Sequence, residues 1–304
     1  MKIVVSACLL GRNCKYNGGN NLDPHVAAYA QDREVLSVCP EECLGMPRVP
    51  MEIVDGVLIN REGTVVDSAV RGQVAKILEA LPGEEIDCCI LKSRSPTCGV
   101  KQIYDGTFSG TLVEGMGVLA QALADAGYAV IDAEDLSDFH FAAGNLVVKP
   151  LSRRDEGNVV KLLTDPLVNR YYLVPDFPDE AAVKALFRRL LTLSRGRQRY
   201  VAGIYLEGEC IGILNETDRP DHGIELGIAI LPEFHGRGFG TAVLAAGAAF
   251  FLKHGFTQVL AGAFAENRAS IRAMEKSGME PLNRRETLTY RGQTHNCVYY
   301  VRTK

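Results

Sequence analysis

Three cysteines, Cys8, Cys39 and Cys98, are the residues whose type and placement most clearly indicate chemistry in this chain. Each comes at or just after the end of a short apolar, β-branched run that predicts a buried strand, at residues 2–7, 33–38 and 86–93. Such strands form parallel sheets, whose ligands bind beyond the carboxyl ends of the strands. The three thiols could therefore face one small volume.

Three thiols at one place suit a soft metal centre. A structural zinc site takes four ligands and often uses a C-x₂-C pair, which the first half of the chain lacks. Three thiolates suit an iron-sulfur cluster, in which one iron would stay open for a soft sulfur atom of a substrate. Cys14 and Cys43 lie in the same loops, and each is a fourth ligand, a spare thiol or an incidental surface residue. The adjacent Cys88 and Cys89 are predicted to be core residues on opposite faces of a strand.

The composition predicts two domains in a reducing compartment. The chain has 304 residues, and seven of its nine cysteines precede residue 144, where metal binding or catalysis is expected rather than disulfides. Residues 1–143 carry 11 Lys and Arg against 20 Asp and Glu, and the remainder carries 22 against 17. The acidic half argues against long nucleic acids as partners, and the basic half could hold a phosphorylated cofactor. No apolar run has transmembrane length and no signal peptide is evident, so we expect a soluble, cytoplasmic protein.

The elements around the cysteines alternate between strand and helix. Besides the three strands, the sequence predicts helices at 23–32, 68–83 and 115–127 and a strand at 128–135. Repeated βα units predict a Rossmann-like, mostly parallel sheet with helices on both faces. The long Gly- and Pro-rich loops around the cysteines are typical of functional loops.

The pattern changes after the segment 136–145, which we expect to join a domain of residues 1–143 to one of residues 144–304. The second domain is predicted to have an α/β fold with a mixed sheet. Its expected strands lie at 146–152, 199–209, 210–216, 223–232, 258–266, 285–292 and 294–302, and its helices at 153–163, 179–194, 240–255 and 268–278.

Three motifs of the first domain are SACLLGRNCKYNGG, VCPEECLGMPRVPMEI and LKSRSPTCGVKQIYDGTFSG. Together they closely resemble the thiouracil desulfidase (TudS-like) family, over residues 1–135. The resemblance implies a 4Fe-4S cluster held by Cys8, Cys39 and Cys98, with the fourth iron taking sulfur from a thiolated uracil base or nucleotide. Cys14 is expected deeper in its loop, away from the strand end, and outside the ligand set.

Desulfuration also needs acid-base groups. Exchanging C=S for C=O requires water to attack the thiocarbonyl carbon and a proton to be transferred. Glu41 and Ser95 lie close in sequence to the second and third motif cysteines, so we expect them to be catalytic. The alternative is that Ser95 only caps its turn and Glu41 only caps the next helix. Glu52 and Asp105 are weaker candidates of the same kind.

In the second domain, GIELGIAILPEFHGRGFGTAV places a Gly-rich turn between a strand and a helix, where backbone N–H groups can bind a phosphate. With AENRASIRAMEKSGME, this string resembles the GNAT acetyltransferases, in particular their ribosomal-protein N-acetyltransferase branch, over residues 146–304. The resemblance implies acetyl-CoA, with Asn267 near its pantetheine arm. It also implies that the pyrophosphate is held by backbone amides around Gly236, Arg237, Gly238, Phe239 and Gly240.

Two positions depart from the GNAT pattern. His235 replaces the usual Gln or Arg at the start of the phosphate loop and is predicted to be a loop residue. Met274 replaces the tyrosine often found as general acid, which leaves positioning as a means of catalysis. Glu225, on the strand before the loop, is the candidate to orient the amine through water, with a merely structural carboxylate as the alternative.

These patterns predict a bifunctional enzyme. One domain would desulfurate a thiolated pyrimidine and release sulfide, and the other would use acetyl-CoA to acetylate an unknown amine. The alternative is that the first domain is a non-catalytic iron-sulfur or sensing module that regulates the acetyltransferase.

Overall fold

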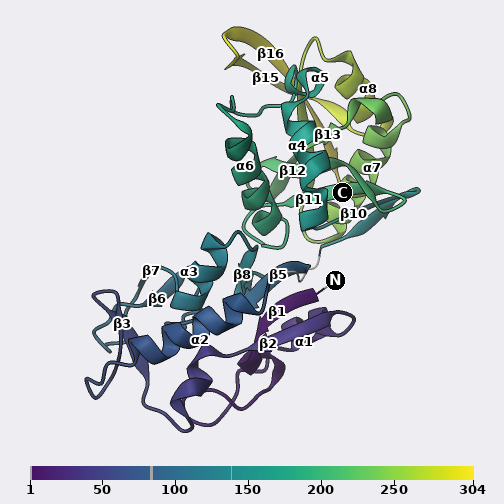
Figure 1. Cartoon of the computed structure of the whole chain (residues 1–304). Coiled ribbons are helices and arrows are strands. Elements are labelled where there is room, and N and C mark those ends of the chain that lie inside the picture. The colour runs from purple at the N-terminus through teal and green to yellow at the C-terminus, as the bar shows by residue number, and fades with distance from the viewer. Residues whose placement is uncertain (1, 83–84, 138) are drawn as a thin grey trace. The chain divides into compact units, whose positions relative to one another are not determined.

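The chain folds into two compact units. The computed structural model describes residues 2–82, 85–137 and 139–304, and its contacts divide the chain into Met1–Asp138 and Phe139–Lys304. Each unit has its own main sheet (Figure 1). None of the helices in these described ranges is long and apolar enough to cross a membrane.

The first unit is built on a parallel sheet with the strand order β2-β1-β5-β8. Its strands are β1 (Lys2–Ser6), β2 (Glu34–Val38), β5 (Ile86–Leu91) and β8 (Val130–Asp132), and its helices are α1 (Pro24–Ala30), α2 (Asp67–Glu79) and α3 (Val118–Asp125). Helices α2 and α3 pack on one face, where Val74 and Leu119 join the cluster that contains Val4. Right-handed crossovers place α1 on the other face, where Ile3 and Ile90 are also fully buried. The predicted parallel, helix-covered sheet is confirmed.

Local sequence explains where these elements begin. Asp23 starts α1, because its side chain accepts the backbone N–H groups of His25 and Val26 at 2.9 and 3.1 Å and Pro24 follows it. The predicted helix 68–83 corresponds to α2, and its last residue lies outside the described residues.

The connections after β2 and β5 each contain a β-hairpin that the sequence analysis did not predict. The hairpins are β3 (Met51–Val54) with β4 (Val57–Asn60), and β6 (Gln102–Tyr104) with β7 (Leu112–Glu114). In the first, Asp55 and Gly56 both have positive φ, which is the conformation of a two-residue turn joining antiparallel strands.

The second unit is built on a mixed sheet in the order β15-β16-β14-β13-β12-β11-β10-β9. Its strands are β9 (Phe141–Ala143), β10 (Leu146–Lys149), β11 (Val201–Leu206), β12 (Glu209–Asp218), β13 (Gly223–Ile230), β14 (Gln258–Phe264), β15 (Glu280–Tyr290) and β16 (Gln293–Thr303). Strand β9 pairs with β10, and Phe141 packs in the same cluster as Leu146. Residues 141–143, expected in the first domain, therefore lie in the sheet of the second unit.

Five helices accompany this sheet: α4 (Glu156–Thr164), α5 (Pro166–Asn169), α6 (Glu180–Leu193), α7 (Phe239–Lys253) and α8 (Arg268–Lys276). Helix α7 buries Val243 and Phe251 in a core with Leu214 and Leu226 of the central strands. This buried apolar contact fixes the helix that follows the glycine-rich turn.

Strands β13 and β14 run parallel, whereas the other neighbouring strands of this sheet are antiparallel. Their pairing covers Gly223, Ile224 and Glu225, and it ends there. Beyond that point β13 continues along β12, and β14 continues along β16. The two parallel strands therefore separate toward their carboxyl ends, and Glu225 stands at the point of separation.

Candidate active sites of the two units

The carboxyl edge of the first sheet gathers four thiols. Cys8, Cys39 and Cys98 come after β1, β2 and β5, which run parallel. The loop after β1 turns back, so that the side chain of Cys14, expected away from the strand end, is hydrogen-bonded to Cys39 and interacts with Cys8. Cys98 also interacts with Cys8.

These thiols are largely withdrawn from water. Burial is the main cause that raises the pKa of Cys8 and Cys39, and it raises the pKa of Cys98 to about 12. Hydrogen bonds from Ser6 and Thr97 lower the pKa of Cys98 in part. Such thiols ionise when they bind a soft metal, because the metal replaces the proton.

The donors gathered at this sheet edge are thiols, which are soft ligands that iron-sulfur clusters take. Over the part of the chain that the structure describes, no three or more His, Cys, Asp or Glu side chains converge on one metal position. In an iron-sulfur cluster each iron takes its own thiolate, so the thiols must surround a volume and need not meet at a point. The thiols that gather at the strand ends are of the type that such clusters take as ligands.

Glu41 lies among these thiols and connects the loops. It belongs to the 3₁₀ turn Pro40–Leu44. Its Oε1 accepts hydrogen bonds from Thr97 Oγ1 at 2.7 Å and Ser95 Oγ at 3.3 Å, and its Oε2 accepts from Arg48 Nη2 at 2.8 Å. Its charge also raises the pKa of Cys8, Cys39 and Cys98. The structure thus shows Glu41 joining the loop after β2 to the loop after β5, beside the thiols.

Ser95 has two kinds of contact. Its Oγ accepts the backbone N–H groups of Thr97 and Cys98 at 3.2 and 3.1 Å, so it does cap the turn. The same hydroxyl faces Glu41. Thr97, which the sequence analysis missed, is fully buried and lies 3.5 Å from Cys98 Sγ as well as contacting Glu41.

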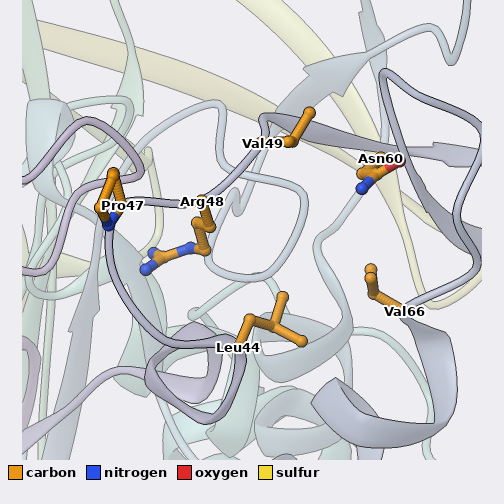
Figure 2. Close-up of a pocket in the computed structure, with 6 residues that line it drawn as sticks. All are labelled: Leu44, Pro47, Arg48, Val49, Asn60 and Val66. Carbon is orange, nitrogen blue, oxygen red and sulfur yellow. The ribbon is translucent and has the colours of Figure 1, made fainter.

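Arg48 is a second missed residue. Its Nη2 donates to the carbonyl of Cys14 at 2.8 Å as well as to Glu41, so it ties the loop after β1 to the loop after β2. Arg48 also lines a pocket of about 470 Å³, whose walls are Leu44, Pro47, Arg48, Val49, Asn60 and Val66 (Figure 2). Asn60 Oδ1 accepts two backbone N–H groups of its own turn, and its amide nitrogen points into the pocket (Figure 2). The pocket thus combines apolar walls with a hydrogen-bond donor.

The remaining candidates of the first unit form hydrogen bonds that stabilise loops. Glu52 accepts the N–H of Phe108 at 3.0 Å, and Asp105 accepts the N–H and hydroxyl of Thr107 at 3.0 and 2.6 Å. Cys43 is exposed, with its sulfur 3.3 Å from the carbonyl of Pro40. Cys88 and Cys89 are fully buried neighbours on β5, which confirms their prediction as core residues.

In the second unit, the turn between β13 and α7 is open at its glycines. Gly236 and Gly238 have φ angles of +75° and +80°, and a Cβ at either position would meet no atom within 4 Å. Among the described residues no side chain caps α7, whose first residues are Phe239 and Gly240, so its leading N–H groups are available to an anion. The Arg237 guanidinium lies 4.6 Å from the Phe239 ring centroid.

The departures from the GNAT pattern have structural roles here. His235 follows the 3₁₀ turn Pro232–Phe234 and is a loop residue, as predicted, and its Nε2 lies 2.7 Å from the carbonyl of Ile230. Met274 is fully buried beside Leu244 and Ala261, which makes it a core residue. Asn267 caps α8 by accepting the N–H of Ser270 at 3.2 Å.

Glu225 is mostly buried where β13 and β14 separate. Its Oε1 accepts from Thr217 Oγ1 at 2.9 Å, and Arg284 Nη1 lies 3.4 Å from its Oε2. Burial raises the pKa of the carboxyl, and the hydrogen bond from Thr217 and the charge of Arg284 lower it in part. A carboxylate in this setting can accept a proton.

Comparisons with known proteins assign the first unit. The family model of 2-thiouracil desulfurase matches residues 3–135. The uncharacterized protein YbbK of Bacillus subtilis (strain 168) is 34% identical over 148 residues, which cover 45% of this chain and 98% of YbbK. The chain belongs to the 2-thiouracil desulfurase family. A solved structure of the 4Fe-4S-dependent thiouracil desulfidase TudS is 30% identical, covering 44% of this chain and 91% of that chain with a TM-score of 0.41.

The second unit of this desulfurase-family chain is similar to GNAT acetyltransferases. The family model of the acetyltransferase (GNAT) domain matches residues 145–280. A solved GNAT-family acetyltransferase from Bacillus anthracis is 18% identical, covering 54% of this chain and 98% of that chain with a TM-score of 0.48. The two matches fall on the two structural units.

Proposed function

We propose that the first unit removes sulfur from a thiolated uracil base or nucleotide and releases it as sulfide. The observation that carries this proposal is the position of Glu41, a carboxylate held by two hydroxyls and an arginine among the strand-end thiols. Membership of the 2-thiouracil desulfurase family supports the same substrate class.

Cys8, Cys39 and Cys98 would hold a 4Fe-4S cluster in this reaction. When bound, such a cluster supplies a Lewis-acidic iron without a protein ligand, which has affinity for the sulfur of the substrate. Ser6 donates a hydrogen bond to Cys98, and a hydrogen bond of this kind stabilises a thiolate ligand.

The residues around the thiols would manage water and protons. Hydrolysis consumes one water: its oxygen replaces the sulfur on the ring carbon, and its two protons leave with sulfide, so no electrons are exchanged. Glu41 would take a proton from the attacking water. Thr97 and Arg48 hold the two carboxylate oxygens in place, and the Ser95 hydroxyl would exchange a proton with the ring. The pocket beside Arg48 gives a pyrimidine apolar walls and the amide donor of Asn60.

For the second unit we propose acetyl-CoA-dependent acetylation of an amine. The backbone amides around Gly236, Gly238 and Gly240 would hold the pyrophosphate, together with those of Arg237 and Phe239, and Asn267 would lie near the pantetheine arm. The amine nitrogen attacks the thioester carbonyl and forms the new C–N bond, the C–S bond breaks and CoA leaves with its electron pair as a thiolate, and the proton lost by nitrogen passes through water to Glu225. The open glycine turn before α7 supports this assignment.

A sulfide-release assay with anaerobically reconstituted protein tests the first function. We expect iron and sulfide to be incorporated, and sulfide to be released from 2-thiouracil, 4-thiouracil or their nucleotides. A loaded protein that releases sulfide from none of them would instead indicate a regulatory or sensing module. A protein that takes up no iron would overturn the cluster assignment.

Calorimetric titration with acetyl-CoA tests the second function. We expect a single binding site in the full chain, with or without the cluster. No detectable binding would leave the second unit with the fold of an acetyltransferase and a different function.

A further inference from the structure

Four residues on successive strands form a row across the sheet of the second unit. Arg284 lies on β15, Tyr299 on β16, Gly262 on β14 and Glu225 on β13. Gly262 and Tyr299 are direct partners in the register. The row leads from the edge strand to the point where β13 and β14 separate.

Contacts join each member of the row to the next. The Arg284 guanidinium lies 4.0 Å from the centroid of the Tyr299 ring. A Cβ at Gly262 would lie 2.8 Å from Tyr299 Cε1 and 3.6 Å from Glu225 Oε1, so the ring and the carboxylate both approach the space that this glycine leaves free. Arg284 Nη1 reaches Glu225 at 3.4 Å.

Glu286 fixes the other side of the guanidinium. Arg284 Nε donates to Glu286 Oε1 at 2.8 Å, and Tyr299 Oη donates to Glu286 Oε2 at 2.7 Å. Arg284 is thus held between two carboxylates and against an aromatic face, an arrangement that suits a planar guanidinium better than an ammonium group.

A bulge aims this side chain. The register between β15 and β16 shifts between Leu282 and Arg285, which leaves Arg284 outside regular pairing. Bulges re-aim side chains and occur often beside active sites. The next residue, Arg285, is exposed. Its charge lowers the pKa of Tyr300, whereas the charge of Arg284 lowers the pKa of Tyr299.

The charges that face Glu225 come from three strands. Burial raises the pKa of its carboxyl, Asp218 and Glu286 raise it further, and Thr217 and Arg284 lower it. Arg284 is the positive charge among these neighbours. The titratable groups facing Glu225 are Asp218 on β12, Arg284 and Glu286 on β15, and Cys297 and Tyr299 on β16.

We infer that Arg284 is a positioning residue for acetyl transfer: from its bulge it holds the Glu225 carboxylate charged and in one orientation where β13 and β14 separate. The inference rests on the proposed acetyltransferase function. Arg284 lies on β15, two strands beyond the parallel pair β13 and β14 that separates at Glu225. A charged Glu225 accepts the amine proton, whereas a neutral one cannot.

Carbon-13 NMR of the full chain labelled at glutamate side-chain carboxyls tests this inference without an acetyl acceptor. The Glu225 signal is assigned by its loss in Glu225→Gln, and its titration midpoint is followed with pH. In Arg284→Gln we expect the midpoint to move upward by about 0.5–1 pH unit, because an opposite charge nearby is removed. Arg284→Lys should fall between the two, since it keeps the charge but not the planar fork.

Arg285→Gln is the matched control, because it removes the same charge from the adjacent, exposed position. Its Glu225 midpoint should stay within about 0.2 pH unit of the wild type, since an exposed charge is screened by water and salt. An equal shift in both variants, or no shift in Arg284→Gln, would overturn the inference. Acetyl-CoA titration of the same samples separates the two proposals, since normal binding with an unmoved midpoint removes only the role of Arg284. No binding by the wild type removes the acetyltransferase function itself.

Discussion

Each unit holds a mostly buried carboxylate beside parallel strands, Glu41 just after β2 and Glu225 near the start of β13, but the two units hold it differently. Glu41 lies in a loop and is held by Ser95 and Thr97 of another loop and by Arg48 of its own loop. Glu225 lies on a strand and is held by the neighbouring strands of its own sheet. The loop site therefore depends on hydrogen bonds between side chains. The sheet site depends on the register of its strands and on Gly262, whose lack of a side chain leaves space for the Tyr299 ring and the Glu225 carboxylate.

The largest expected effect is on the thiols. Exchanging Cys8, Cys39 or Cys98 for Ser should abolish cluster loading, because a hydroxyl does not replace a soft thiolate ligand. Iron and sulfide analysis after anaerobic reconstitution measures this. Exchange of the exposed Cys43 for Ser is the control and should load normally. Cys14→Ser should also load, and loss of iron in that variant would show that the ligand set is wrong.

The next effect concerns the carboxylate in the loop site. Glu41→Gln should retain the cluster and lower the rate of sulfide release about 100-fold or more, because the proton acceptor is lost. Thr97→Val removes one hydrogen bond to Glu41 but keeps the carboxylate, so we expect about a tenfold loss. Equal rates in the wild type and Glu41→Gln would exclude Glu41 as the base.

A backbone change should weaken the cofactor site of the second unit. Gly238→Val places a β-branched residue at a φ of +80°, which strains the turn and crowds the phosphate. We expect the Kd for acetyl-CoA to rise about tenfold or more, measured by calorimetry. Sulfide release by the first unit is the internal control and should not change, and unaltered affinity would show that the turn does not bind the pyrophosphate.

The smallest effect would show how the sheet site is held. Gly262→Ala should destabilise the second unit by about 1–3 kcal/mol, because its Cβ would press on the Tyr299 ring. Gly157→Ala is the control in the same unit, since that exposed helical glycine has open space around it, and it should stabilise by about 0.5–1 kcal/mol. Thermal unfolding compares them, and a stability gain in Gly262→Ala would contradict the close packing of the row.

Much of the first site could be predicted because its signals are local. β-branched runs indicate the strands that place Cys8, Cys39 and Cys98 at one edge of the sheet. Long Gly- and Pro-rich stretches indicate that the loops around these cysteines are functional loops. Thr97 and Arg48 could not be predicted in the same way, because their roles arise only when separate loops meet. The position of Cys14 depends on how its loop turns back, which its distance from β1 does not reveal.

In the second unit, Glu225 and the glycine turn could be predicted from a short stretch of sequence. Arg284 could not, because its aim depends on a bulge that sequence patterns do not place. The sequence placed the start of the second domain at residue 144, whereas the second unit begins at Phe139. The difference arises because β9 has only three residues and is defined by its pairing with β10. The Asp55–Gly56 pair was a signal for the β3–β4 hairpin that could have been used.

The turn before α7 also shows what kind of constraint its glycines impose. Gly236 and Gly238 have open space around them and positive φ. Within the protein, an L-residue at either position is therefore disfavoured by its backbone conformation and not by a lack of room for its side chain. A D-alanine introduced at Gly238 by chemical ligation adopts positive φ as readily as an L-residue adopts negative φ. Mirror-image substitution therefore separates the shape of this backbone from the room that a phosphate needs, which L-residues cannot do.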